Sequence, residues 1–106
     1  MVKIKRLQNK KIIKRLLSNG NVYKTKKYKF YYFSEKEDFS YAISVSKKLG
    51  IATLRNKEKR WLRSIIFQNR LLFKKGGYAF IVIKESGGLF SDASDEVISF
   101  ISQNFK

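Results

Sequence analysis

The sequence predicts an α+β fold in which helices pack on one β-sheet, within a single domain that spans residues 1–106. Three observations lead to this prediction. The six glycines all fall between periodic segments, and no proline interrupts any segment. Residues 39–46 alternate between apolar and small side chains, which is typical of a strand. Residues 52–68 carry apolar residues at helical spacing among many cations.

The amino-terminal half predicts one helix and then two or three strands. The segment NKKIIKRLLSNG places four apolar residues on one helical face and ends at Gly20, a helix C-cap signal. Strand signals follow at residues 22–25, 28–33 and 39–46. In the second of these, Tyr28, Phe30 and Tyr32 share one face, and we expect Lys29 and Tyr31 to lie on the wetter face.

The carboxyl-terminal half predicts a helix, a strand and a helix. The basic helix runs from Ala52 to Gln68, and the segment YAFIVIK forms a buried strand. The last helix begins near Ser91, and acidic residues complement its amino-terminal dipole. Those residues are Asp92, Asp95 and Glu96.

Composition excludes several functional classes. The chain has neither cysteine nor histidine, so it has no disulfide, no zinc-finger ligand set and no triad built on either residue. Its eight carboxylates are scattered, and helix capping explains several of them better than catalysis does. No apolar run is long enough to span a membrane, and we expect a cytoplasmic protein.

Charge is concentrated in one part of the chain. Residues 1–75 hold 22 of the 24 lysines and arginines and four acids, a net charge of +18, whereas residues 76–106 carry −2. For a cytoplasmic protein this asymmetry favours a polyanionic partner, and nucleic acid is the commonest one.

The basic helix separates its cations into stripes. Arg55, Lys59 and Arg63 follow each other at four-residue spacing, and Asn56 and Arg60 form the neighbouring stripe. Only Glu58 opposes five cations between residues 55 and 63, although an ordinary solvated helix interleaves its signs. Arginine and asparagine reach phosphates and base edges with directional hydrogen bonds, which favours nucleic-acid binding over a solvated face.

The segment SVSKKLGIATLRNKEKRWLR, residues 44–63, resembles the signature of the bacterial ribonuclease P protein component. The shared features are Ser-Val-Ser-Lys-Lys, a glycine, Arg-Asn, Lys-Arg and a final Arg. The order of elements agrees over nearly the whole chain. The resemblance implies a two-layer αβββαβα sandwich with one four-stranded sheet and a left-handed βαβ crossover through the basic helix.

The resemblance also implies two RNA-binding surfaces. One would contact the catalytic ribonuclease P RNA through Lys47, Lys48, Arg55, Asn56, Lys57 and Arg60. The other would bind the single-stranded 5′ leader of precursor tRNA through Ile13, Leu17, Tyr31, Lys59 and Arg63. Mg²⁺ held by the RNA would perform hydrolysis, so we expect no catalytic residue and no metal ligand in the protein. No obligate protein partner is evident.

Three other functions fit parts of the sequence. A small basic ribosomal or other structural RNA-binding protein would share the charge and size. A reader of double-stranded DNA could use the basic helix in a major groove, but a strand follows that helix and no dimerisation segment is visible. A free-standing nuclease is the weakest alternative, because the chain lacks a histidine base.

Overall fold

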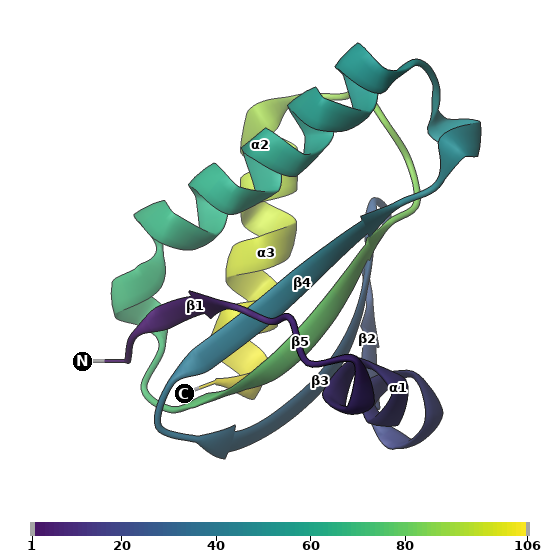
Figure 1. Cartoon of the computed structure of the whole chain (residues 1–106). Helices are drawn as coiled ribbons and strands as arrows, with labels where there is room; N and C mark the ends of the chain where they lie inside the picture. Colours follow the sequence, from purple (N-terminus) through teal and green to yellow (C-terminus); the bar gives the residue numbers. More distant parts are fainter. Residues whose placement is uncertain (1, 106) are drawn as a thin grey trace.

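The computed structural model describes residues 2–105, except for the side chains of residues 35 and 36 (Figure 1). It consists of three α-helices, two short 3-10 helices and one five-stranded sheet. The elements in chain order are β1 (Ile4–Arg6), α1 (Lys10–Asn19), β2 (Asn21–Lys24), β3 (Tyr28–Lys36), β4 (Phe39–Val45), η1 (Lys47–Leu49), α2 (Ala52–Gln68), η2 (Arg70–Leu72), β5 (Gly76–Ile83) and α3 (Phe90–Asn104).

The sheet mixes parallel and antiparallel pairs in the order β1-β4-β5-β3-β2. Strands β4 and β5 are parallel neighbours, and the chain crosses between them through α2, as the resemblance implied. The left-handed sense of that crossover stays a prediction. The mixed α+β class is confirmed, and the sheet has one strand more than expected, because β1 pairs with the outer edge of β4.

The face of the sheet that holds Tyr28, Phe30 and Phe39 packs against α2 and α3 (Figure 1). All three side chains are fully buried, and Phe30 stacks on Phe100 of α3 with ring centroids 3.9 Å apart. Burying an aromatic side chain of this size stabilises a fold by about 1.5–3 kcal/mol. The core therefore fixes α3, and α2 with it, against the strands.

Helix α1 packs on the opposite face. Strand residues alternate between faces, so Phe33 points away from the core that holds Tyr32, and the guanidinium of Arg15 lies over the Phe33 ring. The helix begins after Asn9, whose side chain accepts hydrogen bonds from the first-turn amides, and it buries Leu16 completely. Helices α2 and α3 therefore pack on one face of the sheet and α1 packs on the other. Tyr31 of β3 lies on the α1 side.

Candidate nucleic-acid interface

Helix α2 presents most of its predicted RNA-binding side chains to solvent. It has the bounds predicted from sequence, and it buries Leu62, Ile65 and Ile66 on its inner side. Asn56, Lys57 and Arg60 are exposed, as are Lys47 and Lys48 in the adjoining η1. Arg55 is half-buried, and its Nε atom has no hydrogen-bond partner among the described residues.

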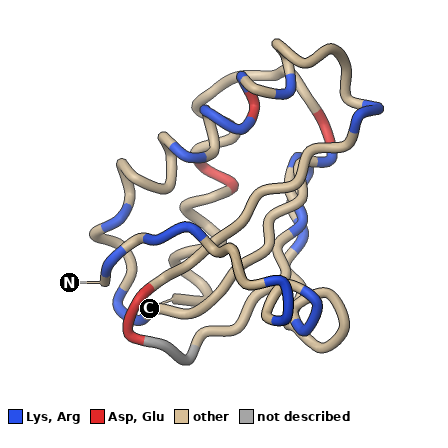
Figure 2. Tube along the Cα trace, in the orientation of Figure 1, with Lys and Arg blue, Asp and Glu red and all other residues tan. Residues whose placement is uncertain are grey.

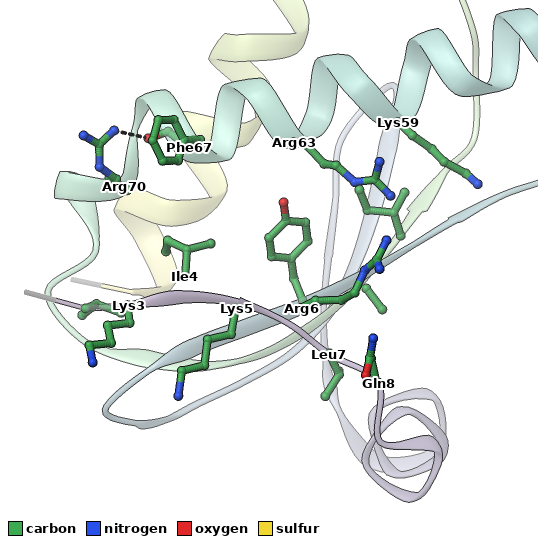
Figure 3. Close-up of a pocket in the computed structure, with 14 residues that line it drawn as sticks. Lys3, Ile4, Lys5, Arg6, Leu7, Gln8, Lys59, Arg63, Phe67 and Arg70 are labelled. Carbon is green, nitrogen blue, oxygen red and sulfur yellow. Dashed lines mark hydrogen bonds between the residues drawn. The ribbon is translucent and has the colours of Figure 1, made fainter.

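A groove of about 1180 Å³ opens between α2, β1 and β4 (Figure 3). Lys59 and Arg63 line it from α2, and Tyr41 to Ile43 line it from β4. Strand β1 and the residues beside it form the other wall, from Val2 to Gln8. The groove thus collects cations from two elements that are far apart in the sequence.

The pKa of Tyr41 is affected by the charges that line this groove. Burial raises the pKa of its phenol above the ordinary value, and the positive charges of Arg63 and Arg6 oppose that rise. Arg63, Arg6 and Tyr41 all line the groove. Figure 3 shows Arg63 and Arg6 extending into the groove from facing sides.

The predicted leader-binding residues fall into two neighbouring groups. Lys59 and Arg63 line the groove, whereas Ile13, Leu17 and Tyr31 lie on the α1 side of the sheet. Leu17 is 48% exposed, Ile13 and Tyr31 are half-buried, and the Lys29 ammonium lies 4.9 Å from the centroid of the Tyr31 ring.

A row of side chains across the sheet connects the two groups. Phe80 of β5 pairs with Tyr31 on one side and with Ala42 on the other. Paired residues share a face, so Ala42, Phe80 and Tyr31 form one line across β4, β5 and β3. Ala42 also borders the groove. The line therefore runs along the α1 side of the sheet, from the Tyr31 ring to Ala42 at the border of the groove.

Few of the cations are neutralised within the protein. Among the described residues there are two ion pairs, Lys5–Asp38 at 2.7 Å and Lys27–Glu58 at 2.6 Å. Lys and Arg follow one another along β1, α1 and α2, and acidic residues are sparse there (Figure 2). Uncompensated cations on adjoining elements create a positive field that attracts a polyanion.

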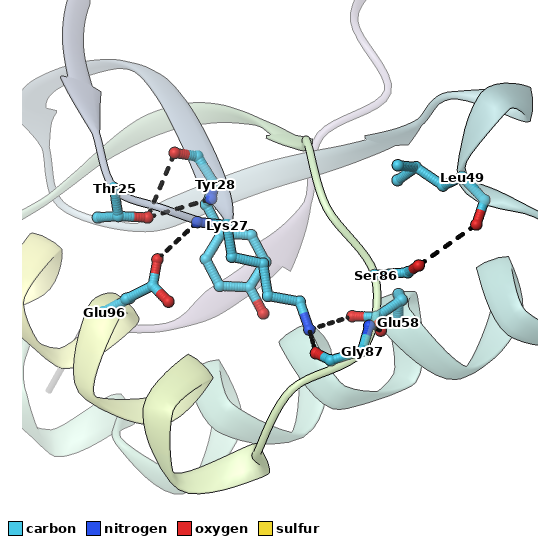
Figure 4. Close-up of polar contacts among 8 residues, drawn as sticks. All are labelled: Thr25, Lys27, Tyr28, Leu49, Glu58, Ser86, Gly87 and Glu96. Carbon is cyan, nitrogen blue, oxygen red and sulfur yellow. Dashed lines mark hydrogen bonds and ion pairs between the residues drawn. The ribbon is translucent and has the colours of Figure 1, made fainter.

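Glu58 is the one carboxylate of α2, and it does not reduce the positive charge on the helix surface. It is fully buried, and its carboxylate pairs with the Lys27 ammonium and accepts a hydrogen bond from the Gly87 amide at 2.9 Å (Figure 4). The Lys27 ammonium also donates to the Gly87 carbonyl at 2.8 Å. The network joins α2 to the β2–β3 turn and to the loop before α3.

Glu96 takes part in the same region rather than capping α3. Its carboxylate accepts a hydrogen bond from the backbone amide of Lys27 at 2.8 Å. The N-cap of α3 is Leu89, without a side-chain cap bond, and Asp92 is the acidic residue in the first turn. The capping prediction therefore holds for Asp92 as a charge near the helix dipole, and it is wrong for Glu96.

The described residues contain no cluster of three acidic, histidine or cysteine side chains that could hold a metal ion. Within the same part of the chain, no helix is both long enough and apolar enough to cross a membrane.

Comparison with known proteins gives a consistent result. The family model described as Ribonuclease P matches residues 1–100. Ribonuclease P protein components from Streptococcus agalactiae and Mesoplasma florum are each 34% identical to this chain. The first alignment covers 82% of this chain and 79% of the relative, and the second covers 73% and 76%.

The fold has close counterparts among solved structures. The ribonuclease P protein from Thermotoga maritima superposes with a TM-score of 0.79 at 20% identity, covering 92% of this chain and 96% of the other. A Staphylococcus aureus ribonuclease P protein superposes with a TM-score of 0.76 at 23% identity, covering 95% and 97%. At these identities the superpositions support the fold alone.

Proposed function

The chain belongs to the ribonuclease P protein family, and we propose that it works there by binding two RNA segments on separate surfaces. As a ribonuclease P protein component it is a subunit of an endoribonuclease. One surface, at η1 and the exposed side of α2, would dock on the catalytic RNA. The other, comprising the groove and the Tyr31 side of the sheet, would bind the single-stranded 5′ leader of precursor tRNA.

The observation that carries this proposal is the division of cations on α2. Arg60 and Asn56 point to open solvent, while Lys59 and Arg63 line the groove. One helix can therefore contact two RNA segments at once, because the two segments use different side chains. Tyr31, with Lys29 over its ring, offers the aromatic surface on which an unpaired base can stack.

The chemistry of cleavage is assigned to the RNA rather than to the protein. The chain has no histidine, and the described residues form no three-ligand metal site. We infer that Mg²⁺ bound by the RNA subunit carries out hydrolysis. Lysines and arginines of the protein would reduce phosphate repulsion between the two RNAs and hold the leader, which raises the affinity for substrate.

Reconstitution tests the proposal. Single-turnover cleavage of a 5′-labelled precursor tRNA is measured with a bacterial ribonuclease P RNA at low Mg²⁺, with and without the protein. The protein should stimulate cleavage strongly and should cut nothing alone. Arg60→Gln should weaken binding to the ribonuclease P RNA, whereas Arg63→Gln should weaken substrate binding by the assembled enzyme, each about tenfold.

Lys75→Gln is the matched control, because Lys75 is an exposed cation in the loop before β5 and does not line the groove. It should behave like the wild type. An absence of stimulation, together with tight, salt-sensitive binding to unrelated RNA, would support the alternative of a structural RNA-binding protein. Equal effects of Arg60→Gln and Arg63→Gln on both binding steps would contradict the two-surface division.

A further inference from the structure

Strand β1 brings an arginine to the groove that the sequence motif does not include. Arg6 pairs with Tyr41 of β4, and Ile4 pairs with the buried Phe39. Ile4 packs against the core on the α2 side of the sheet, and Arg6 shares that face because strand residues alternate. The backbone of the strand end is fixed, since the Leu7 amide donates to the Tyr41 carbonyl at 2.8 Å.

The other cation of β1 is already neutralised. Lys5 points to the opposite face and pairs with Asp38 at 2.7 Å. Neither Arg6 nor Arg63 has a carboxylate partner in the part of the chain that the structure describes. Arg6 extends into the groove from β1 and Arg63 from α2 (Figure 3), so two positively charged guanidinium groups face one open space.

Such an arrangement is unfavourable unless an anion occupies the space between the two groups. A guanidinium presents a planar fork of donors that matches a phosphate, and two forks on facing walls can bind the two free oxygens of one phosphodiester. The groove is open and connects through Ala42 to the row that leads to Tyr31. A single strand stacked at Tyr31 can therefore continue over the edge of β4 to this point.

We propose that Arg6 and Arg63 together bind one phosphate of the precursor tRNA leader, beyond the nucleotide at Tyr31. This inference rests on the proposed function and extends it, because β1 then makes substrate affinity depend on leader length. A short leader ends before it reaches Arg6, whereas a longer one occupies the whole groove.

The test compares two precursor tRNAs, with leaders of about two and about ten nucleotides. The first leader is shorter and the second is longer than about four nucleotides, the lower end of the site sizes of single-strand grooves. Dissociation constants are measured with the holoenzyme assembled from wild-type protein, Arg6→Gln, Arg6→Lys or the Lys75→Gln control. With the long leader, Arg6→Gln should weaken binding about tenfold. With the short leader it should match the wild type.

Four further readouts separate a phosphate contact from a structural effect. Arg6→Gln should reduce the slope of log K against log salt by about 0.7, the value for one contact to a single strand. Arg6→Lys should restore part of the affinity, since it keeps the charge but not the fork. The double variant with Arg63→Gln should lose less than the product of the two single losses. The melting temperature should stay within about 2 °C, because Arg6 is exposed.

The outcomes distinguish this inference from the proposed function. If Arg6→Gln behaves like Lys75→Gln on both leaders while Arg63→Gln weakens binding, the Arg6 contact is wrong and the proposed function stands. If Arg6→Gln weakens binding to the ribonuclease P RNA itself, with equal losses for both leaders, the groove holds a phosphate of the RNA subunit and the leader assignment is wrong. If the wild-type protein gives no benefit to any precursor, the proposed function itself is lost.

Discussion

The carboxylate of Glu58 lies beneath α2 with both of its oxygens engaged. One oxygen pairs with Lys27 at 2.6 Å, and the other accepts from the Gly87 amide. Trp61 flanks the pair, with the Lys27 ammonium 5.0 Å from the centroid of its ring. Removing one charge from a buried pair leaves the other without compensation, and the desolvation cost of that charge is then fully felt.

We therefore expect the single variants Glu58→Gln and Lys27→Met each to lower the free energy of unfolding by about 3–5 kcal/mol. The double variant should lie within about 1 kcal/mol of the wild type, because no charge remains buried and the glutamine can still accept from the Gly87 amide. Urea denaturation of the four proteins measures this.

The exposed pair Lys5–Asp38 provides the control. Its side chains are 55% and 37% exposed, and Asp38→Asn should change stability much less than either buried variant. Equal effects at the two pairs would mean that the buried network contributes no more than a surface contact. That result would show that the buried network does not hold α2 against the rest of the fold.

At the scale of single residues, the predicted helix-dipole role of Glu96 is wrong, and the burial of Glu58 is not visible in the sequence. The partner of Glu58, Lys27, is 31 residues away and belongs to a turn with no helical or strand periodicity. A contact between such distant residues depends on the tertiary fold, and local patterns do not contain it. The assignment of Tyr31 to the wetter face was confirmed, because strict alternation in a strand is a local property.

At the scale of elements, long periodic segments were predicted well and short ones were not. Helix α2 has the predicted bounds, because its apolar spacing extends over several turns. Strand β1 has only three residues and was missed, since Ile-Lys-Arg carries no usable alternation. It is a strand because the edge of β4 offers unpaired backbone groups, which the Lys3 carbonyl and the Leu7 amide help to satisfy.

The junction of β3 and β5 depends on a glycine for a reason that the sequence does not display. The register between these strands shifts between Phe33 and Lys36, and Gly77 lies beside that irregularity. A Cβ atom at Gly77 would clash with the backbone carbonyl of Phe33, and its φ of +157° is also unusual for other residues. Backbone atoms cannot move aside as a flexible side chain can.

We expect Gly77→Ala to lower the free energy of unfolding by about 3 kcal/mol, because the strands must separate locally to admit the methyl group. Gly88→Ala is the matched control: its φ is +78°, but nothing lies within 4 Å of the added carbon. That change should cost about 1 kcal/mol from backbone strain alone. Similar urea midpoints for the two variants would show that β3 and β5 can move apart at Gly77 without a loss of stability.

For the molecule as a whole, charge and size together determine how salt acts. The net charge is +16, and the Cα trace measures 35 × 28 × 20 Å along its principal axes. At an ionic strength near 0.01 M the screening length is about 30 Å, so every cation repels nearly all the others. Near 0.15 M the length falls to about 8 Å, and only neighbouring cations still interact.

Salt should therefore affect the folded state and RNA binding in opposite directions. Screening relieves the self-repulsion of the free protein, and a gain of about 1 kcal/mol corresponds to a rise in melting temperature of about 4–8 °C for a domain of this size. Over the same range, RNA affinity should fall, with a log–log slope of about −0.7 for each single-strand phosphate contacted. Calorimetry of the free protein and a binding titration measure the two effects.

A variant with fewer charges outside the interface separates self-repulsion from other effects of salt. Lys74 and Lys75 are exposed and lie outside both proposed RNA surfaces. Replacing both with glutamine should reduce the gain in melting temperature and leave the slope of RNA binding unchanged. A melting temperature that is insensitive to salt in the wild type would show that pairing and burial already offset the repulsion. If instead the double variant lost part of its RNA-binding slope, the polyanion would be held by the whole basic surface rather than by the two surfaces on α2 and the groove.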